Sequence, residues 1–580
     1  MLSSIALPGL PERPPTQFMI PLQFRPALLD ALEGYNGPRF MADLSAGLTV
    51  AVVALPLAMA FAIASGLKPE AGIFTAIIGG FLISALGGSR VQIGGPAGAF
   101  IVIVYGIVAT YGLANLLIAT ICAGVLMFVM GAMRLGRFIR FIPVSIVIGF
   151  TNGIAVLIAI SQLRDFFGLQ ITELPADFFG QMKAFILSAA SFNPYSVALG
   201  ATSLALVVLW PKSYSASDST LYRLLARVPG TLIVLILGTL AVAMFNIPVE
   251  TIGSRFGGIP RDLPEFVLPE FEWKTVQHLF GPIITIAILG AIESLLCARV
   301  ADSMIGDRHD PNQELMAQGI ANVAAPLFGG LCATGTIART ATNVRAGATS
   351  PIAGMVHALA LLIVLLAAAP LAQNVPLASL AAILLFVAWN MGEWREFARL
   401  KNFSHSHRII LLTTFVLTIV MDLTVAVEVG IVLSCVFFIV RVATGTRVEE
   451  FGESERNQYE FPQSVGGYRI IGALFFGAVN KLDVLIDRRR LKYQSLIVDL
   501  SGVFMMDATG LEALESLHRQ MSKHGGRLIL VGPGPQVADK INRAGFGAHL
   551  GPEGMVTSIE EAVNIVNHRL RRPVSEPPTS

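Results

Sequence analysis

The apolar run at residues 408–440, RIILLTTFVLTIVMDLTVAVEVGIVLSCVFFIV, constrains the fold most strongly. A helix needs about 20 mainly apolar residues to cross roughly 30 Å of hydrocarbon, so this run is long enough for two crossings. Similar runs occur at 48–66, 115–132, 230–245 and 357–372. With 54% hydrophobic and only 14% charged residues, the chain is too apolar for an ordinary soluble protein. We therefore predict a polytopic α-helical membrane protein with twelve to fourteen spans.

The charges between these runs predict the orientation. Segments 134–140, 212–227 and 393–408 are rich in basic residues, whereas 164–179 and 249–273 are more acidic. Basic loops stay on the cytoplasmic side of a membrane. With fourteen spans both termini are then cytoplasmic, and because the N-terminal segment lacks the pattern of a cleaved signal peptide, we expect the first span to direct insertion.

The four cysteines, Cys122, Cys297, Cys332 and Cys435, lie in or beside apolar runs and form no CxxC pair. We expect no disulfide, no bound metal and no cofactor. The sequence also has no Walker-type phosphate loop and no GxSxG motif, so an enzyme is the least favoured class, and we expect no nucleic-acid partner.

The composition changes after about residue 445. Charged residues become frequent, and expected strands at 468–476, 495–503 and 527–532 alternate with expected helices at 511–525 and 558–570. This alternation predicts a small α/β domain outside the bilayer. The predicted domains are an N-terminal cytoplasmic segment (1–38), a transmembrane domain (39–445), an α/β domain (446–572) and a disordered tail (573–580).

Two segments of the membrane region share a pattern. GGSRVQIGGPAGAF (87–100) and GGLCATGTIART (329–340) each have a double glycine followed by a second glycine-containing break. They lie about 240 residues apart, which leaves room for seven spans per repeat, in repeats of about 39–246 and 275–443. An odd number of spans places two repeats in opposite orientations, as in many secondary transporters. The similarity is weak by itself.

A helix from near Thr336 to just before Pro351 would be about 22 Å long, too short to span the bilayer. Pro96 is expected in the first turn of a second broken helix. If both helices begin near the membrane midplane, their free N–H groups and positive dipole ends form an anion site. Arg339 would add charge to this site, or alternatively bond stray carbonyls or pair with an acid; Arg345 points elsewhere.

Glu293 is an ionisable residue within an apolar run, GPIITIAILGAIESLLCARVADSM at 281–304. A carboxylate at this depth is unfavourable by several kcal/mol unless it is paired, hydrated or protonated. Two readings stay open. Glu293 carries a proton that is coupled to transport, or it forms an ion pair with Arg339.

Several motifs together carry a family resemblance: VALPLAMAFAIASGLKPEAG (53–72), the 87–100 segment, LGAIESLLCARVADSMIG (289–306), TIARTATNVRAGATSPIAG (336–354) and DLSGVFMMDATGLEAL (499–514). The chain resembles the sulfate permease (SulP) family of anion transporters, which end in a STAS domain. The resemblance covers residues from about 35 to 570. It implies fourteen spans in two inverted seven-span repeats, arranged as a core domain and a gate domain, and a homodimer.

The resemblance also implies a substrate site between the third and tenth helices. By position, this site consists of Phe61, Ala97, Gly98, Ala99, Ala338, Arg339 and Thr340. A glutamine that many members carry in the first helix is replaced by Leu57.

In STAS domains of anti-sigma-factor antagonists, a phosphorylated serine stands at the position of Thr509. Thr509 is therefore a candidate phosphosite, with helix N-capping before Leu511 as the simpler alternative. The STAS domain would bind a cytoplasmic regulatory protein.

Among family members, the chain most resembles bacterial C4-dicarboxylic acid transporters. This implies proton-coupled uptake of succinate, fumarate, malate or aspartate across the bacterial inner membrane. Sodium-coupled bicarbonate transport and sulfate transport are alternatives within the family. Two alternatives to a coupled transporter also stay open: an anion channel, and a signalling protein that acts through its STAS domain.

Overall fold

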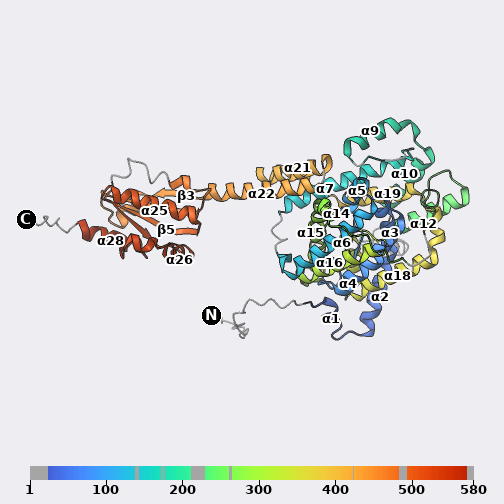
Figure 1. Ribbon diagram of the computed structural model, residues 1–580, viewed down its shortest axis with the longest axis horizontal. Coiled ribbons are helices and arrows are strands. Elements are labelled where there is room, and N and C mark those ends of the chain that lie inside the picture. Colours follow the sequence, from blue (N-terminus) through green and yellow to red (C-terminus); the bar gives the residue numbers. More distant parts are fainter. Residues whose placement is uncertain are drawn as a thin grey trace, which may run out of the picture. The chain divides into compact units, whose positions relative to one another are not determined.

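The computed structural model describes residues 24–137, 143–171, 174–175, 177–210, 229–259, 264–421, 423–482 and 493–570. The chain forms two compact units, Met1–Ile431 and Val432–Ser580. Figure 1 labels their elements. The basic segment 212–227 and the predicted tail 573–580 lie outside the described residues.

The first unit is almost entirely helical. Its first elements are α1 (Ala27–Ala31), α2 (Gly37–Ala64), α3 (Pro69–Phe74), the π-helical turn η1 (Thr75–Gly79), α4 (Gly80–Leu86), β1 (Gly94–Gly95), η2 (Gly98–Phe100), α5 (Ile101–Tyr111), α6 (Leu113–Ala132), η3 (Leu135–Arg137), α7 (Val144–Ser161), α8 (Leu163–Phe167), α9 (Phe178–Ser188), η5 (Ala189–Ser191), α10 (Pro194–Leu209), α12 (Gly230–Phe245) and α13 (Ile252–Phe256). The following elements are α14 (Trp273–His278), α15 (Phe280–Ile305), α16 (Pro311–Leu327), β2 (Thr334–Gly335), α17 (Ile337–Arg345), α18 (Ile352–Ala368), η6 (Ala369–Asn374), α19 (Leu377–Met391), α20 (Trp394–Ala398), η7 (Leu400–Asn402), α21 (His405–Val420) and α22 (Leu423–Gly445), which continues into the second unit.

In the described part of the chain, six helices are long and apolar enough to cross a membrane. The consecutive helices α9 and α10 add a seventh candidate, bent by 115°. Five further apolar helices are shorter, at 10–17 residues. This agrees with a polytopic membrane domain, whereas the count of fourteen spans stays a prediction.

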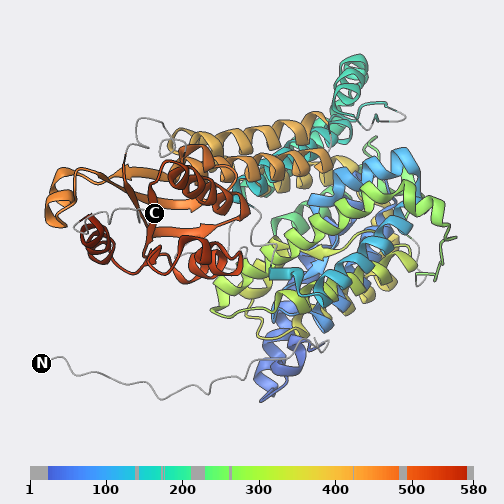
Figure 2. The same ribbon diagram turned by 60° about the vertical axis from the view of Figure 1, so that its left-hand side comes forward.

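Helices from the two halves of this unit lie side by side, the early ones blue and the later ones green to yellow in Figure 2. Their contacts form a reciprocal pattern. Helix α6 of the first half packs against α15 and α16, and helix α18 of the second half packs against α2 and α4. The pattern is reciprocal if α15 is the counterpart of α2, α16 of α3–α4, and α18 of α6. In that case each half places one helix against the first two helices of the other half, as expected for two structurally equivalent repeats.

Glycines allow the closest of these crossings. A methyl group placed on Gly124 of α6 would lie 2.7 Å from the carbonyl oxygen of Gly319 on α16. A methyl on Gly319 would lie 2.6 Å from the carbonyl oxygen of Gly124. Because neither position has room for a side chain, the two backbones are in direct contact, as small residues permit in membrane helices.

Two buried carboxylates hold the chain breaks in place. Asp43 of α2 accepts hydrogen bonds from the backbone N–H groups of Thr349 (2.6 Å) and Ser350 (3.2 Å), just before α18. Glu314 of α16 accepts from the N–H groups of Gly88 (2.9 Å) and Ser89 (3.3 Å), just after α4. Irregular backbone inside a membrane domain needs such partners, because lipid offers none.

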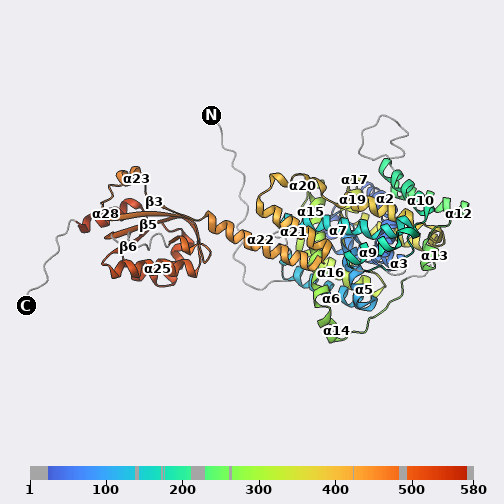
Figure 3. The same cartoon turned by 90° about the horizontal axis from the view of Figure 1, so that it is seen from above.

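The second unit contains a five-stranded sheet in the order β3-β4-β5-β6-β7. Its strands and helices are β3 (Arg447–Glu450), α23 (Glu453–Gln458), β4 (Val465–Leu474), η8 (Val479–Leu482), β5 (Ser495–Met506), α25 (Ala508–Lys523), β6 (Arg527–Val531), α26 (Pro535–Arg543), α27 (Phe546–Leu550), β7 (Met555–Val556) and α28 (Ile559–Leu570). β3 pairs antiparallel with β4, and the other neighbours are parallel. Helices α25 and α28 cover opposite faces (Figure 3). The predicted α/β domain is therefore present.

Thr509 is exposed in the first turn of α25 and does not cap it. The N-cap is Asp507, whose carboxylate accepts from the N–H groups of Gly510 (2.8 Å) and Phe476 (3.0 Å). The capping alternative for Thr509 is thus wrong, because Asp507 already satisfies the helix start. Its phosphorylation stays a prediction.

The α6–α16 crossing gives a stability test. We expect Gly319→Ala to destabilise the membrane domain by about 1–3 kcal/mol, because the added methyl overlaps backbone atoms. The apparent melting temperature of the purified protein in detergent should fall by about 1–4 °C. Gly281→Ala is the matched control, since nothing lies within 4 Å of that position. Equal melting temperatures for the two variants would contradict the close packing.

Candidate functional site

Two short strands bring the two glycine-containing segments together inside the membrane domain. β1 pairs antiparallel with β2, with Gly94 opposite Gly335 and Gly95 opposite Thr334. The helical turn η2, leading into α5, begins after β1, and α17 begins after β2. The predicted meeting of two helix starts is therefore present in the structure.

The bounds of both helices differ from the predictions. α17 ends at Arg345 and does not continue to Pro351, because Gly347 takes a left-handed conformation (φ +93°) and the N–H groups that follow bond to Asp43. Pro96 lies in extended chain before η2 and outside the first helical turn. In both cases contacts with distant parts of the chain set the boundary.

In the described residues, neither helix start has a side-chain cap. The N-cap residues are Ala97 for η2 and Thr336 for α17, and no described side chain accepts a hydrogen bond from either first turn. Free N–H groups at a helix start favour a bound anion. The Thr336 hydroxyl is directed elsewhere, to the carbonyl of Ile93 at 3.1 Å.

The structure brings Phe61 of α2 next to Gly98. A methyl group on Gly98 would lie 3.6 Å from Phe61 Cε1 and 3.5 Å from both Ile158 Cδ1 and Met391 Sδ. Ala97, Gly98 and Ala99 are buried, whereas Ala338 is exposed. Both predicted groups of residues thus lie just after the paired strands, and Ala338 is the exposed member of the second group, since Arg339 and Thr340 are buried.

Thr340 has a structural contact. Its hydroxyl accepts from the N–H of Ile93 at 2.9 Å and lies 3.3 Å from Cys297 Sγ on α15. This contact ties α17 to α15 and to the chain entering β1.

Arg339 is the largest fully buried side chain of the described residues, at 1% exposure. Its Nη1 would lie 2.4 Å from a methyl group on Gly95, so the guanidinium rests on β1. Within the described part of the chain, its three side-chain nitrogens have no hydrogen-bond partner. A buried charge without a counter-charge is unfavourable by several kcal/mol, so the arrangement favours an anion as the missing partner.

Glu293 lies near the middle of α15 and is half-buried. The described residues contain no ion pair between Glu293 and Arg339, so the pairing alternative is absent from this structure. Helix α15 packs against both β2 and α17. Glu293 is therefore carried by a helix that contacts the site without neutralising its arginine.

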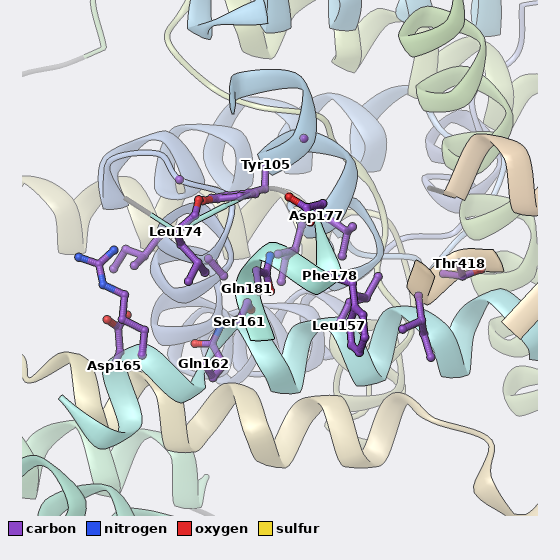
Figure 4. Close-up of a pocket in the computed structure, with 18 of the residues that line it drawn as sticks. Tyr105, Leu157, Ser161, Gln162, Asp165, Leu174, Asp177, Phe178, Gln181 and Thr418 are labelled. Carbon is purple, nitrogen blue, oxygen red and sulfur yellow. Dashed lines mark hydrogen bonds between the residues drawn. The ribbon is translucent and has the colours of Figure 1, made fainter. Parts of the chain in front are cut away.

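A cavity of about 300 Å³ with several polar side chains in its lining lies near the site. Figure 4 shows residues that line it. It lies between α2 and α5 on one side and α7, α8 and α9 on the other. Ile101 and Leu157 line it, one turn or less from Phe100 and Ile158. The Tyr105 hydroxyl on α5 donates to the carbonyl of Leu174 and so links the two walls.

Charged residues gather at this cavity. Arg255 bonds to Asp165 at 2.8 Å and also to Glu250. Burial lowers the pKa of Arg255, but these two carboxylates outweigh it, and the pKa lies above its usual value. The Arg164 Nε is buried and has no partner among the described residues. These charges come from segments 164–179 and 249–273, whose sequence predicts only an orientation in the membrane, because no local pattern in them indicates a cavity.

Half-helices that begin at a common point inside a membrane domain are typical of secondary transporters, in which such helix starts face anionic groups of the substrate. Residues 40–414 match the Sulfate permease family, and residues 457–562 match the STAS domain. The chain belongs to the sulfate permease family and is an anion transporter, not an enzyme. The predicted family resemblance is confirmed.

Related proteins and solved structures support this family assignment. The chain is 42% identical to "Putative sulfate transporter YvdB" of Bacillus subtilis, over 90% of this chain and 97% of that protein. It is 28% identical to "Bicarbonate transporter BicA" of Picosynechococcus sp., over 90% and 94%. The transmembrane domain of a cyanobacterial BicA matches with TM-score 0.60 and 30% identity, over 68% of this chain and 98% of that one. The murine Solute Carrier 26 family member A9 shares the fold, with TM-score 0.81 and 20% identity, over 93% and 94%.

Gly95 gives a test of the Arg339 position. Its φ of +147° is unfavourable for residues with a side chain, and Gly95→Ala would place a methyl against the Arg339 guanidinium. We expect the dissociation constant for a labelled anion to rise about tenfold, roughly 1.4 kcal/mol. Gly281→Ala, which meets open space near the start of α15, should leave binding unchanged. Equal affinities in a binding assay on the two purified variants would contradict this placement.

Proposed function

We propose that this protein is a secondary active transporter that carries C4-dicarboxylates by alternating access, with protons as the coupling ion. The observation that carries the anion site is Arg339, a fully buried guanidinium whose nitrogens have no partner among the described residues. Such a charge is expected to recruit an anion in each transport cycle.

The proposed site lies where α5 and α17 begin. The uncapped helix starts supply N–H donors and positive dipole ends. Ala97, Gly98, Ala99 and Ala338 would bind the anion through backbone groups, with Phe61 as one wall and Arg339 as the charge. Small residues suit this role because they let an anion approach the backbone closely. Thr340 would shape the site from behind, because its N–H donates to the carbonyl of Thr336 and its hydroxyl accepts from Ile93.

Dicarboxylates are proposed on sequence resemblance. The runs PLAMAFAIASG (56–66), GAIESLLCA (290–298), NVRAGATSPI (343–352) and VAWNM (387–391) resemble those of the bacterial dicarboxylate transporter DauA. Succinate, fumarate, malate and aspartate each carry two carboxylates. One carboxylate would accept hydrogen bonds from the N–H groups at the helix starts, and the second carboxylate would face Arg339.

Sulfate is the second candidate. A relative that shares 42% identity over 90% of the chain is named as a sulfate transporter. Sulfate is also a dianion, and no described residue of the site distinguishes a tetrahedral sulfate group from a planar carboxylate. Bicarbonate, the ion in the name of a more distant relative at 28% identity, is third.

Glu293 is the proposed proton carrier. Symport of a dianion with protons requires a titratable group close to the substrate, and Glu293 is the acid of α15 that no ion pair occupies in the described structure. Movement of the α2, α5 and α17 group past α7 and α19 would expose the site to each side in turn, with the cavity of Figure 4 as one vestibule.

The remaining predictions are part of the same proposal. The protein would lie in a bacterial inner membrane with fourteen spans in two inverted repeats and both termini cytoplasmic, and it would act as a homodimer. The STAS domain would bind a cytoplasmic regulatory protein, with phosphorylation of the exposed Thr509 as a switch.

Uptake into proteoliposomes tests the function. We expect labelled succinate to accumulate when an inward proton gradient is imposed, and unlabelled fumarate to inhibit this more strongly than sulfate or bicarbonate. Uptake of sulfate without any uptake of succinate would leave the anion site in place and replace the substrate. A saturable flux distinguishes a transporter from a channel, which would pass current.

The same liposomes test Glu293. We expect Glu293→Gln to abolish gradient-driven accumulation, because glutamine cannot take up a proton, while exchange of internal for external substrate continues. Glu272→Gln, before α14, is the control. Concentrative uptake at the wild-type rate in the Glu293 variant would remove this residue from the coupling mechanism.

A further inference from the structure

A second cavity, different in character from that of Figure 4, lies among the membrane helices. Its volume is about 280 Å³. Its lining consists of Leu55, Met59, Ile73, Leu232, Leu235, Ile236, Thr239, Leu240, Ile259, Val364, Leu365, Ala372 and Val375. All of these are apolar except Thr239, whose hydroxyl already donates to the carbonyl of Leu235 at 2.6 Å. No lining side chain is left to bind water.

The position of the cavity places it at the depth of the hydrocarbon. Leu235 and Leu240 lie in the middle of α12, which contains no charged residue. The neighbouring outer surface is apolar too, since Leu237 is 50% exposed on α12 and Ile363 is 66% exposed on α18. Side chains of this kind on a membrane helix face acyl chains.

The cavity opens toward that surface. Two of its lining residues, Ile236 and Leu240, are 44% and 49% exposed, whereas Leu235, Met59 and Leu365 in its wall are buried. It is therefore a recess that runs inward from the lipid-facing surface between helices, and it is continuous with the bilayer.

We propose that this recess binds one acyl chain of a membrane phospholipid. Water is excluded because the walls offer it no hydrogen bonds, and a cavity of roughly 150 Å³ with similar walls stays dry and takes up a hydrocarbon ring. The recess has about 280 Å³, enough for several methylene groups of a chain. An empty recess would lose the dispersion contacts of every side chain that lines it.

The bound chain would lie between two groups of helices. α2 and α18 pack against each other and form one wall, while α12 packs against α10 and α19 and forms the other, and α12 also touches α2 directly. Any sliding of these groups changes the shape of the recess. The inference goes beyond the proposed function, because it holds whichever anion is carried.

The test uses the full-length protein in nanodiscs made with phosphatidylcholine brominated in the middle of its acyl chains. By cryo-electron microscopy, we expect bromine density at a fixed place between α2 and α12, about threefold above that of the surrounding lipid, because a chain in the recess is immobilised. Thr239→Phe fills the recess and should remove this density. Leu237→Phe, on the outward surface of the same helix, should leave it unchanged.

Thr239→Leu fills part of the recess and serves if the phenylalanine variant does not fold. An empty recess, ordered water in it, or a helix from another subunit seated there would overturn the proposal, as would bromine density that both variants retain. Since the readout is density and not uptake, a failure of the proposed transport activity would be separate from a failure of this inference.

Discussion

The pairing of β1 with β2 is the contact on which the rest of the membrane domain depends. Four residues meet, Gly94 with Gly335 and Gly95 with Thr334. They fix the starts of α5 and α17 at one point, and the chain on either side is irregular. The backbone N–H and C=O groups of this irregular chain therefore need hydrogen-bond partners from buried side chains. Glu314 accepts from the backbone after α4, and Asn322 bonds both the N–H and the C=O of Ala333 before β2.

The buried charges differ in how they are satisfied. Asp43 and Glu314 each accept several hydrogen bonds from backbone and hydroxyl groups, so they act as structural clamps. Arg339 is buried just as deeply but has no partner in the described structure. Asp43 and Glu314 are thus satisfied within the fold, whereas the guanidinium of Arg339 has no partner among the described residues, which is consistent with membership of an anion transporter family.

Helix α2 borders both cavities. Ile63 and Ala64 near its C-terminus line the polar cavity, and Leu55 and Met59 in its middle line the apolar recess. The opposite walls come from α7 to α9 in one case and from α12 in the other. Incomplete packing on two sides of one helix marks where groups of helices can slide, because close-packed crossings such as Gly124 with Gly319 leave no such space.

Three features could be predicted from local patterns in the sequence: hydrophobic runs indicate the membrane class, strand–helix alternation indicates the α/β domain, and glycine spacing indicates where two helices start. The other features depend on tertiary contacts. Asp43 bonds the backbone that follows α17, and Asp507, not Thr509, caps α25. Arg339 lies against Gly95 of β1 and forms no ion pair with Glu293 in the described residues. Neither cavity could be predicted from the sequence. Each of these features depends on side chains or backbone groups far apart in the chain, and their pairing is set by packing, which no local pattern records.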